Sequence, residues 1–315
     1  MRILVIKPSS LGDIVHGMVV VSELKMQRPD CVIDWVVGDR FFDIVSESKI
    51  ASRVIVYERH GGMASVFPLI REIRREVYDY VFDMQGLARS GLMTFFSKSL
   101  RKIGRKDARE LAFLAYSETI AYPGPVHAID ILKEFLSVAD CKSEVSGLVK
   151  ELKNIQSPLF KLFLEKKTFP SKIVCIFPES RRKEKKWSFF IPLIQNLLEQ
   201  TKDIAIFVLG NECFTRESLV SPFLFDLCGQ TSLRDIVVFI QNAQLVIAND
   251  SGPLHISAAL GRPTLGLFTA TDPLRFGPYP FHRSTNMALQ LKNTPSEVDT
   301  ILQKTLEILS YDAPR

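Results

Sequence analysis

Short apolar runs alternate with longer amphipathic segments along the whole chain. The apolar runs lack strict alternation of apolar and polar residues, which is typical of strands that are covered on both faces. We predict strands at Ile3–Ile6, Val32–Val37, Val54–Val56, Tyr80–Phe82, Ile173–Phe177, Ala205–Leu209, Leu245–Ala248 and Thr264–Phe268. We predict helices at Ile14–Gln27, Ala64–Glu76, Phe189–Gln200, Leu233–Ile240, Pro253–Leu260 and Ser296–Ser310.

This alternation predicts an α/β protein with parallel sheets and crossover helices. The segment Lys150–Lys172 has lysine clusters, two prolines and no predicted strand. We place a domain boundary near residue 165, which gives two Rossmann-like, doubly wound domains over residues 1–165 and 166–315. The last helix could pack on either domain. Two such domains are expected to face each other across a cleft at the carboxyl ends of their strands, where ligands bind.

Composition indicates a soluble globular protein. The chain has 315 residues, of which 46% are hydrophobic and 24% are charged. No apolar stretch reaches the ~18 residues of a membrane-spanning helix. The run Ile3–Ile6 is too short for a signal peptide, and Lys7 interrupts it. The five cysteines are scattered without a C-x-x-C pair, which favours reduced thiols in a cytoplasm over disulfides or zinc.

The net charge of +5 is unevenly distributed along the chain. Arg59–Arg109 contains 11 Lys and Arg against 5 Asp and Glu, and Lys161–Trp187 contains 9 against 3, so each region carries a net charge of +6. Two basic regions indicate anionic ligands or an anionic surface, although a solvated basic face would have the same composition.

The segment A-N-D-S-G-P-L-H, Ala248–His255, joins a predicted strand to a predicted helix. Asp250 or Ser251 can cap that helix, and the following proline suits its first turn. Gly252 would let a phosphate approach the backbone N–H groups, where the helix dipole favours an anion. His255 lies near the same end of the helix. The pattern predicts an anion site, and a capped helix with an incidental histidine is the alternative.

Two further turns follow predicted strands of the second domain. The turn S-R-R-K-E-K-K-W begins at Ser180, and its Arg182 and Lys185 could bind a pyrophosphate, whereas its other lysines fit a solvated charge run. The turn L-G-N-E ends at Glu212, whose carboxylate could accept a hydrogen bond from a ribose hydroxyl. Glu217 is the alternative for that role.

In the first domain, the first predicted strand leads into P-S-S-L-G-D-I-V-H, Pro8–His16. A fixed carboxylate at Asp13 does not suit a phosphate site. Asp13 could instead cap the helix Ile14–Gln27 or act as a general base. The motif D-M-Q-G, Asp83–Gly86, presents polar groups at the same edge of the sheet, and the basic segment Lys98–Glu110 is predicted to be a loop.

Taken in order, these motifs resemble those of the bacterial lipopolysaccharide heptosyltransferases, glycosyltransferase family 9. The matching segments are K-P-S-S-L-G-D-I-V-H, D-M-Q-G-L, G-R-K-D-A-R-E, H-A-I-D, K-x-W, G-Q-T-S-L, N-D-S-G-P-L-H, T-D-P and G-P-Y, and they span nearly the whole chain. Two of them, D-M-Q-G-L-A-R-S and H-A-I-D, resemble heptosyltransferase I more than heptosyltransferase II. The chain departs from the family at His127–Ile131, which lacks an arginine, and at Thr269–Pro273, which lacks a glycine.

The resemblance implies a GT-B glycosyltransferase that transfers L-glycero-D-manno-heptose from ADP-heptose to the Kdo region of lipid A. It implies inversion at the anomeric centre and no metal or other cofactor. Asp13 falls on the family's catalytic base and Lys185 on a lysine that contacts the donor phosphate. With the candidates above, the predicted donor-binding residues of the C-terminal domain are Ser180, Arg182, Lys185, Glu212, Thr231, Asp250, Ser251, Gly252 and His255.

The first turn then belongs to the acceptor, whose hydroxyl would lose its proton to Asp13. The carboxylate of Kdo and the phosphates of lipid A match arginine geometry. The predicted acceptor-binding residues of the N-terminal domain are Ser10, Gly12, Arg59, Gln85, Arg105 and Arg109. A lipid-linked acceptor would place the enzyme peripherally on the cytoplasmic face of the inner membrane, where a nearby Lys or Arg contributes about 1 kcal/mol.

Three other interpretations were weighed. Another GT-B nucleotide-sugar transferase, such as heptosyltransferase II or III, would share most of these motifs. A NAD-dependent dehydrogenase is disfavoured because no G-x-G-x-x-G follows the first strand. A non-catalytic binder of an anionic polymer would explain the basic regions. A nucleic-acid partner is not expected, since these regions have few interleaved aromatic residues for base stacking.

Overall fold

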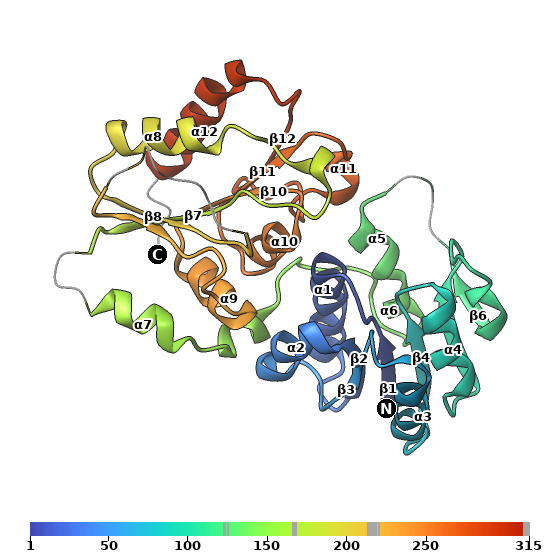
Figure 1. Cartoon of the computed structure of the whole chain (residues 1–315). Helices are drawn as coiled ribbons and strands as arrows, with labels where there is room; N and C mark the ends of the chain where they lie inside the picture. Colours follow the sequence, from blue (N-terminus) through green and yellow to red (C-terminus); the bar gives the residue numbers. More distant parts are fainter. Residues whose placement is uncertain (122–123, 125, 166–168, 213–218, 220, 311–315) are drawn as a thin grey trace. The chain divides into compact units, whose positions relative to one another are not determined.

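The computed structural model describes residues 1–121, 124, 126–165, 169–212, 219 and 221–310, apart from the side chains of residues 63 and 64. Contacts within the chain divide it into two compact units, Met1–Asn154 and Ile155–Arg315. In each unit, helices pack around a parallel sheet (Figure 1). The predicted α/β class with two doubly wound units is confirmed.

The first unit has, within its described residues, a six-stranded sheet in the order β3-β2-β1-β4-β5-β6 with parallel pairing throughout. Its strands are β1 (Arg2–Ile6), β2 (Val32–Gly38), β3 (Arg53–Tyr57), β4 (Tyr80–Asp83), β5 (Arg101–Arg105) and β6 (Glu118–Ile120). Its helices are α1 (Leu11–Gln27), α2 (Phe42–Ser48), α3 (Gly62–Ile73), α4 (Ala88–Phe96), α5 (Ala128–Leu132) and α6 (Glu134–Val138), with 3-10 turns η1 (Asp39–Phe41), η2 (Ala112–Ala115) and η3 (Lys150–Asn154).

The second unit repeats this topology, again within its described residues, with the sheet order β12-β11-β10-β7-β8-β9. Its strands are β7 (Lys172–Phe177), β8 (Ile204–Val208), β9 (Leu224–Asp226), β10 (Leu245–Asn249), β11 (Thr264–Phe268) and β12 (Asn286–Gln290). Its helices are α7 (Pro158–Leu164), α8 (Phe190–Gln200), α9 (Leu233–Asn242), α10 (Gly252–Ala259), α11 (Pro273–Phe276) and α12 (Val298–Ser310), with 3-10 turns η4 (Lys183–Lys185) and η5 (Pro295–Glu297).

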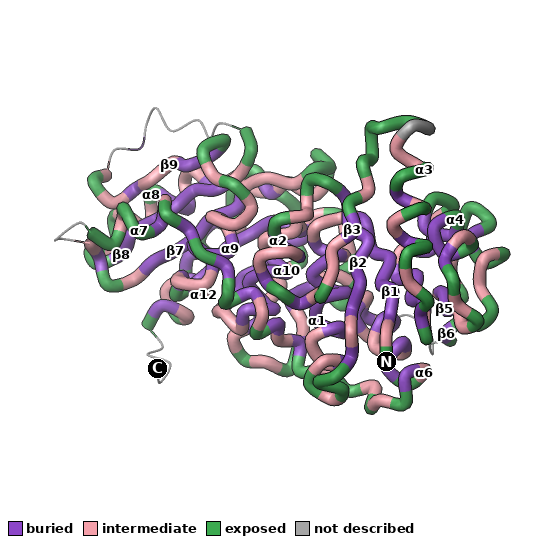
Figure 2. Tube along the Cα trace, turned by 90° about the horizontal axis from the view of Figure 1, so that it is seen from below, coloured by how far each residue is buried: buried purple, intermediate pink, exposed green. Residues whose placement is uncertain are grey.

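The central strands of both sheets are buried on both faces. In β1 the side chains of Ile3–Ile6 are fully buried, and β7, β8, β10 and β11 are buried along most or all of their length (Figure 2). Crossover helices cover both faces of such a sheet, so its strands read as continuous apolar runs. All eight predicted strands are present, although the edge strand β3 is only partly buried.

The structure divides the chain between Asn154 and Ile155, earlier than the boundary we placed near residue 165. Helix α7 joins the second unit because its aromatic side chains pack there. The ring of Phe160 lies 5.0 Å from that of Phe239, and the ring of Phe163 lies 5.1 Å from that of Phe207, both edge to face. The lysine-rich composition of this region does not reveal the packing of the buried Phe160 and the half-buried Phe163.

Helix α12 packs on the second unit. Its Ile301, Leu302 and Leu309 belong to the apolar core of that unit, and Lys172 Nζ donates a hydrogen bond to the Leu309 carbonyl oxygen at 2.7 Å. The amphipathic pattern predicted this helix, but it did not specify the sheet on which the helix packs.

The sequence-based expectation of a loop over Lys98–Glu110 is wrong, because Arg101–Arg105 forms β5. This strand is held by charged side chains more than by apolar burial. Arg101 forms a bidentate ion pair with Glu118 of β6, at 2.9 Å for both contacts, and lies over the Tyr80 ring of β4 at 4.8 Å. The charged residues of β5 do not form the apolar run by which the other strands were predicted. The edge strands β6, β9 and β12 were also not predicted.

Gly104 of β5 allows a close approach that shapes the carboxyl edge of the first sheet. A Cβ atom at this position would lie 2.0 Å from the Tyr116 ring, which packs directly over the strand. The Tyr116 hydroxyl donates a hydrogen bond to Oδ2 of the buried Asp83 at 2.8 Å. Because Gly104 has no side chain, the Tyr116 ring can pack on β5, and its hydroxyl then orients the Asp83 carboxylate at the end of β4.

We expect Gly104→Ala to lower the free energy of unfolding by about 1–3 kcal/mol, because the methyl group must displace the Tyr116 ring from Asp83. Urea denaturation measures this. Tyr116→Phe is the matched control, since it removes the hydroxyl and keeps the ring. A Gly104→Ala protein as stable as its parent would contradict this packing.

Candidate active site

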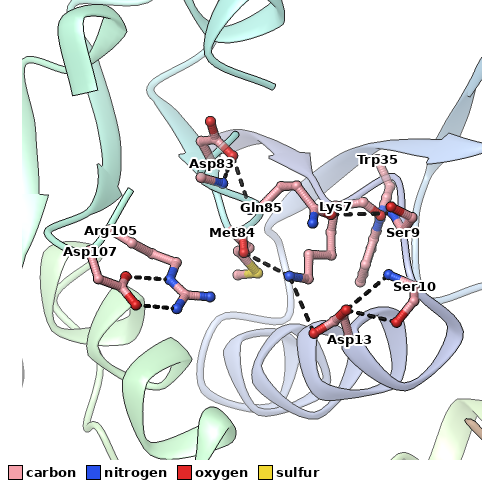
Figure 3. A network of polar contacts seen from close by, with 11 residues as sticks. Lys7, Ser9, Ser10, Asp13, Trp35, Asp83, Met84, Gln85, Arg105 and Asp107 are labelled. Carbon is pink, nitrogen blue, oxygen red and sulfur yellow. Dashed lines mark hydrogen bonds and ion pairs between the residues drawn. The ribbon is translucent and has the colours of Figure 1, made fainter. Parts of the chain in front are cut away.

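Two polar loops of the first unit meet beside the carboxyl ends of β1 and β4 (Figure 3). The Lys7 side chain, which directly follows β1, is 2% exposed, and its Nζ donates a hydrogen bond to the Met84 carbonyl oxygen at 2.9 Å. The backbone N–H of Ser9 donates to Gln85 Oε1 at 3.3 Å. These contacts join the loops where the strand order reverses, which is the usual ligand position in such sheets.

Asp13 lies in the first turn of α1 and caps that helix through one of its oxygens. Its Oδ2 accepts hydrogen bonds from the Ser10 backbone N–H at 3.0 Å and from Ser10 Oγ at 2.8 Å. Its Oδ1 lies 3.9 Å from Lys7 Nζ, and 44% of the side chain is exposed. Helix α1 begins at Leu11, earlier than predicted, so Ser10 is its N-cap and Asp13 completes a capping box as the third residue of the helix. The carboxylate remains accessible to a ligand while the cap fixes its orientation.

Lys7 is a candidate that the sequence analysis did not select. Burial lowers the pKa of its ammonium group, the Asp13 carboxylate raises it, and the Arg105 guanidinium lowers it. A lysine is almost never fully buried without a partner. A lysine directly after a buried strand was therefore the signal that could have identified it.

Asp83 supports the loop after β4. Its Oδ1 accepts hydrogen bonds from the backbone N–H groups of Gln85 at 2.9 Å and Gly86 at 3.0 Å. Burial raises the pKa of this carboxyl group, while its hydrogen bonds to Gly86 and Tyr116 lower it. Asp83 thus fixes the backbone of Gln85 and Gly86, and this backbone determines where the Gln85 side chain lies.

The other acceptor candidates differ in position. Arg105, at the carboxyl end of β5, is held by a bidentate contact with Asp107, at 2.9 and 2.7 Å, on the same edge as Lys7 (Figure 3). Arg109 is exposed, and its backbone N–H donates to the Gly86 carbonyl oxygen at 2.9 Å. Gly12 is buried in the first turn of α1. Arg59 is exposed beyond β3, which three strands separate from β5 in the sheet order, so the structure does not bring it into this group.

The second unit has a tighter cluster at its own reversal of strand order, between β7 and β10. Lys185 Nζ lies 2.6 Å from Asp250 Oδ2, and Thr271 Oγ1 donates to the same oxygen at 2.5 Å. Ser180 Oγ donates to the Asp250 carbonyl oxygen at 3.1 Å. One aspartate after β10 thus connects the loops after β7 and β11. Thr271, from the T-D-P motif, was not among the selected residues.

Beside this cluster, helix α10 begins after Ser251. Gly252 is its first residue, and His255 is buried on it with 8% exposure. The Ser251 side chain makes no capping hydrogen bond, and its buried Oγ has no hydrogen-bond partner among the described residues. A helix N-terminus with a spare hydroxyl and a nearby ammonium group can bind an anion.

A second buried hydroxyl also lacks a partner among the described residues. Thr231 Oγ1 lies just before α9, which Ser232 caps through hydrogen bonds with Asp235. A buried hydroxyl without a hydrogen bond costs free energy unless a ligand or water satisfies it. Thr285 and Asn286 of this unit also have an unpartnered buried oxygen among the described residues, but Thr231 and Ser251 lie at the starts of α9 and α10, where a ligand could bind their hydroxyls.

The remaining donor candidates are exposed ion-pair members. Arg182 contacts Glu184 at 2.5 Å, and Glu212, with 77% of its side chain exposed, contacts Lys186 at 3.2 Å. These contacts do not bring Arg182 or Glu212 to Asp250. Glu217, the alternative to Glu212, lies outside the described residues.

Two residues that were not selected order these loops. Glu179 accepts hydrogen bonds from the backbone N–H groups of Asn211, at 2.9 Å, and Glu212, which fixes the loop after β8. The buried amide of Asn249 accepts from the Trp187 backbone N–H at 3.0 Å and donates to the Pro178 carbonyl oxygen at 2.7 Å. Both residues directly follow or end a buried strand, which is the signal that could have found them.

In the part of the chain that the structure describes, no group of three or more His, Cys, Asp or Glu side chains is arranged to hold a metal ion. Nor does any described helix have the length and apolar character to cross a membrane. The four described cysteines, Cys31, Cys141, Cys175 and Cys228, are free thiols, and Cys213 lies outside the described residues.

A family model described as glycosyltransferase family 9 (heptosyltransferase) matches residues 66–306, more than half of the chain. The chain belongs to glycosyltransferase family 9. It is a glycosyltransferase enzyme, so the resemblance noted in the motifs is confirmed, and the non-catalytic binder and the dehydrogenase are set aside. The match begins after Asp13, so the role of that residue rests on the geometry above and on its motif.

Among individual relatives, lipopolysaccharide core heptosyltransferase OpsX of Haemophilus influenzae is 26% identical over 284 residues, covering 87% of this chain and 81% of that protein. Lipopolysaccharide heptosyltransferase 1 of Salmonella typhimurium is 28% identical over 300 residues, covering 89% and 92%. Lipooligosaccharide heptosyltransferase 2 of H. influenzae is 26% identical, so identity does not separate the subtypes.

Solved family 9 structures have the same fold. The E. coli heptosyltransferase WaaC with ADP gives a TM-score of 0.83 at 23% identity, covering 98% of this chain and 100% of that one. The E. coli ADP-heptose lipopolysaccharide heptosyltransferase II gives 0.74 at 17% identity, covering 98% and 99%. The chain therefore has the GT-B fold that its resemblance to the family implied.

We expect Thr231→Val to leave the free energy of unfolding unchanged within about 0.5 kcal/mol, or to raise it, because the Thr231 hydroxyl has no hydrogen-bond partner among the described residues. Ser180→Ala is the comparison, and it should cost about 0.5–1.5 kcal/mol because it removes a hydrogen bond to Asp250. Urea denaturation measures both. A larger loss for Thr231→Val than for Ser180→Ala would contradict a hydroxyl kept for a ligand.

Proposed function

We propose that this family 9 enzyme is a heptosyltransferase that transfers L-glycero-D-manno-heptose from ADP-heptose to the Kdo region of lipid A, with inversion at the anomeric carbon. Supporting relatives are named lipopolysaccharide heptosyltransferases, and solved relatives are described with ADP or with ADP-2-deoxy-2-fluoro heptose. The motifs D-M-Q-G-L-A-R-S and H-A-I-D favour addition of the first heptose. Transfer of a later heptose is the alternative.

The observation that carries the proposal is the cluster beside α10 in the second unit. A nucleoside diphosphate needs donors for its phosphates and its nucleoside. The Lys185 ammonium group has three N–H donors, of which Asp250 takes one. The N-terminus of α10, with Ser251 and Gly252, adds backbone donors. We assign ADP-heptose to this cluster, with Thr231 on the nucleotide.

The chemistry assigned to the first unit is general base catalysis. Asp13 takes the proton of the acceptor hydroxyl as its oxygen forms a bond to the anomeric carbon. The bond from that carbon to the diphosphate oxygen breaks, and negative charge develops on ADP. Lys185 and the N-terminus of α10 stabilise this charge. The nucleophile attacks opposite the leaving group, so the anomeric configuration inverts.

Lys7 gives Asp13 a fixed electrostatic environment. Its ammonium group lies 3.9 Å from Asp13 Oδ1, while Ser10 donates twice to Oδ2. These contacts hold the Asp13 carboxylate in one orientation at the end of β1. Arg105 and Gln85 lie on the same edge and are assigned to the anionic acceptor, with the exposed Arg109 nearby along the chain. Arg59 is assigned only to the wider basic surface.

The acceptor also determines where the enzyme would be located in the cell. Lipid A is embedded in a membrane, so we propose that the enzyme acts as a peripheral protein on the cytoplasmic face of the inner membrane.

The experiment that tests this function is incubation with ADP-heptose and de-acylated Kdo-lipid A, followed by mass spectrometry. One added heptose is expected. An acceptor that already carries one heptose tests the alternative subtype, and calorimetry with UDP- and GDP-sugars tests the donor. Transfer only to the heptosylated acceptor would assign a later step, and binding of another nucleotide sugar alone would overturn the donor.

We expect Asp13→Asn to reduce the rate of transfer by about 10²–10⁴-fold, because an amide cannot accept the proton. The amide keeps the shape of the side chain, so the calorimetric affinity for ADP-heptose should change little. Single-turnover assays at saturating donor measure the rate. Loss of donor affinity with an unchanged rate would place Asp13 on the donor instead.

We expect Lys185→Ala to weaken ADP-heptose binding and turnover together, by about tenfold or more, because the ammonium group contacts the diphosphate in both states. Thr231→Val should weaken ADP binding without loss of folding stability. Lys186→Ala is the matched control, since its ion pair is exposed. Unchanged kinetics for Lys185→Ala would remove this residue from the proposed site.

A further inference from the structure

Helix α4 buries few apolar side chains and exposes two. Its buried residues are Ser90, Gly91, Met93 and Thr94, whereas Leu92 and Phe95 are 47% and 60% exposed. The buried hydroxyls are satisfied locally, since Ser90 Oγ donates to the Leu87 carbonyl oxygen and Thr94 Oγ1 to that of Ser90, both at 2.9 Å. Surface helices of globular proteins normally place apolar residues inward and polar residues outward.

The turn η2, packed against α4, adds to this apolar surface. Gly91 permits the contact, because a Cβ there would lie 2.9 Å from Ala112 Cα. Only Ala112 of the turn is buried, while Phe113 and Leu114 are 50% and 72% exposed. The preceding Leu111, 66% exposed, has a φ of 61°, a left-handed conformation that costs a residue with a Cβ some free energy.

Basic side chains surround these apolar groups. We define the α4–η2 surface as the exposed residues Arg89, Leu92, Phe95, Lys98, Leu100, Leu111, Phe113 and Leu114, together with the half-buried Lys102. Lys102 Nζ donates to the Phe95 carbonyl oxygen at 2.7 Å and lies 5.9 Å from the Phe95 ring centre. Residues 88–115 contain seven Lys and Arg and two Asp and Glu, a net charge of +5.

We propose that the α4–η2 surface inserts its apolar side chains into an anionic lipid bilayer while its basic side chains contact the lipid phosphates. Exposed Phe and Leu flanked by Lys and Arg is the composition of segments that lie in a membrane interface. This deepens the proposed function, since it names the surface by which an enzyme with a lipid-linked acceptor would reach its membrane. Helices α3 and α4 lie side by side, and α3 adds exposed Phe67 and Arg71 (Figure 2).

Self-association is disfavoured by charge. In a symmetric dimer the same patch contacts itself, so an interface through this surface would bring Arg89, Lys98 and Lys102 of one copy close to the same residues of the other. An anionic bilayer neutralises that charge instead. Leu162 and Leu164 of α7 are also exposed and lie in the second basic region, but outside the α4–η2 surface, so they supply a control.

The test is co-sedimentation of the full chain with vesicles of phosphatidylcholine alone and with added phosphatidylglycerol. The parent is expected to bind the anionic vesicles. Phe113→Ser/Leu114→Ser should reduce the binding affinity at least about tenfold, and Arg89→Gln/Lys98→Gln should reduce it on anionic vesicles only. Leu162→Ser/Leu164→Ser is the control with similar exposure, and it should bind as the parent does.

The proposal that the α4–η2 surface binds the bilayer would be wrong if both patch variants bound vesicles as the parent does, or if the parent did not bind them. A dimer, seen by light scattering, that the Phe113→Ser/Leu114→Ser exchange converts to a monomer would also contradict it. Transfer to the de-acylated acceptor in solution should be unchanged in this variant, which also shows that it is folded. If the parent transferred no heptose, the proposed function would be wrong, whereas the vesicle experiment would still test membrane binding by the α4–η2 surface independently.

Discussion

The reversal of strand order beside the first strand of each sheet is the constraint on which the rest of this molecule depends. In both sheets the connections leave in opposite directions from that strand, so helices on opposite faces separate at one point of the carboxyl edge. Loops from strands far apart in sequence meet there without a helix between them. Lys7 and Met84 meet in this way in the first unit, and Lys185 and Asp250 in the second.

Each reversal point holds a lysine and an aspartate, but the two pairs differ. In the first unit the lysine is buried and the aspartate is 44% exposed, with 3.9 Å between the charged atoms. In the second unit both side chains are largely buried and in contact at 2.6 Å. The loose pair leaves a carboxylate accessible, which suits proton transfer. The tight pair secures an ammonium group beside a helix N-terminus, which suits an anion.

Much of this arrangement could be predicted from the sequence. Buried parallel strands are continuous apolar runs, and their carboxyl ends are marked by polar turns, so the fold and the loops around Asp13 and Asp250 were found. The elements that were not predicted depend on contacts that an apolar pattern does not report. Strand β5 is held by Arg101 and its partners Glu118 and Tyr80, and no apolar pattern reports such contacts. Helix α7 was not predicted, because its lysine-rich segment was interpreted as a hinge region, although Phe160 and Phe163 pack it on the second unit. Lys7 and Glu179 act through partners distant in sequence, which only the folded chain brings near them.

The shared carboxylate of Asp250 has a consequence for events at the second reversal point. A single oxygen, Oδ2, holds both Lys185 and Thr271, and so ties the loop after β7 to the loop after β11. Any ligand that draws the ammonium group toward its own phosphates weakens one side of this tie and leaves the threonine as the remaining partner. The T-D-P segment on the loop after the neighbouring strand is thereby coupled to the position of the Lys185 side chain.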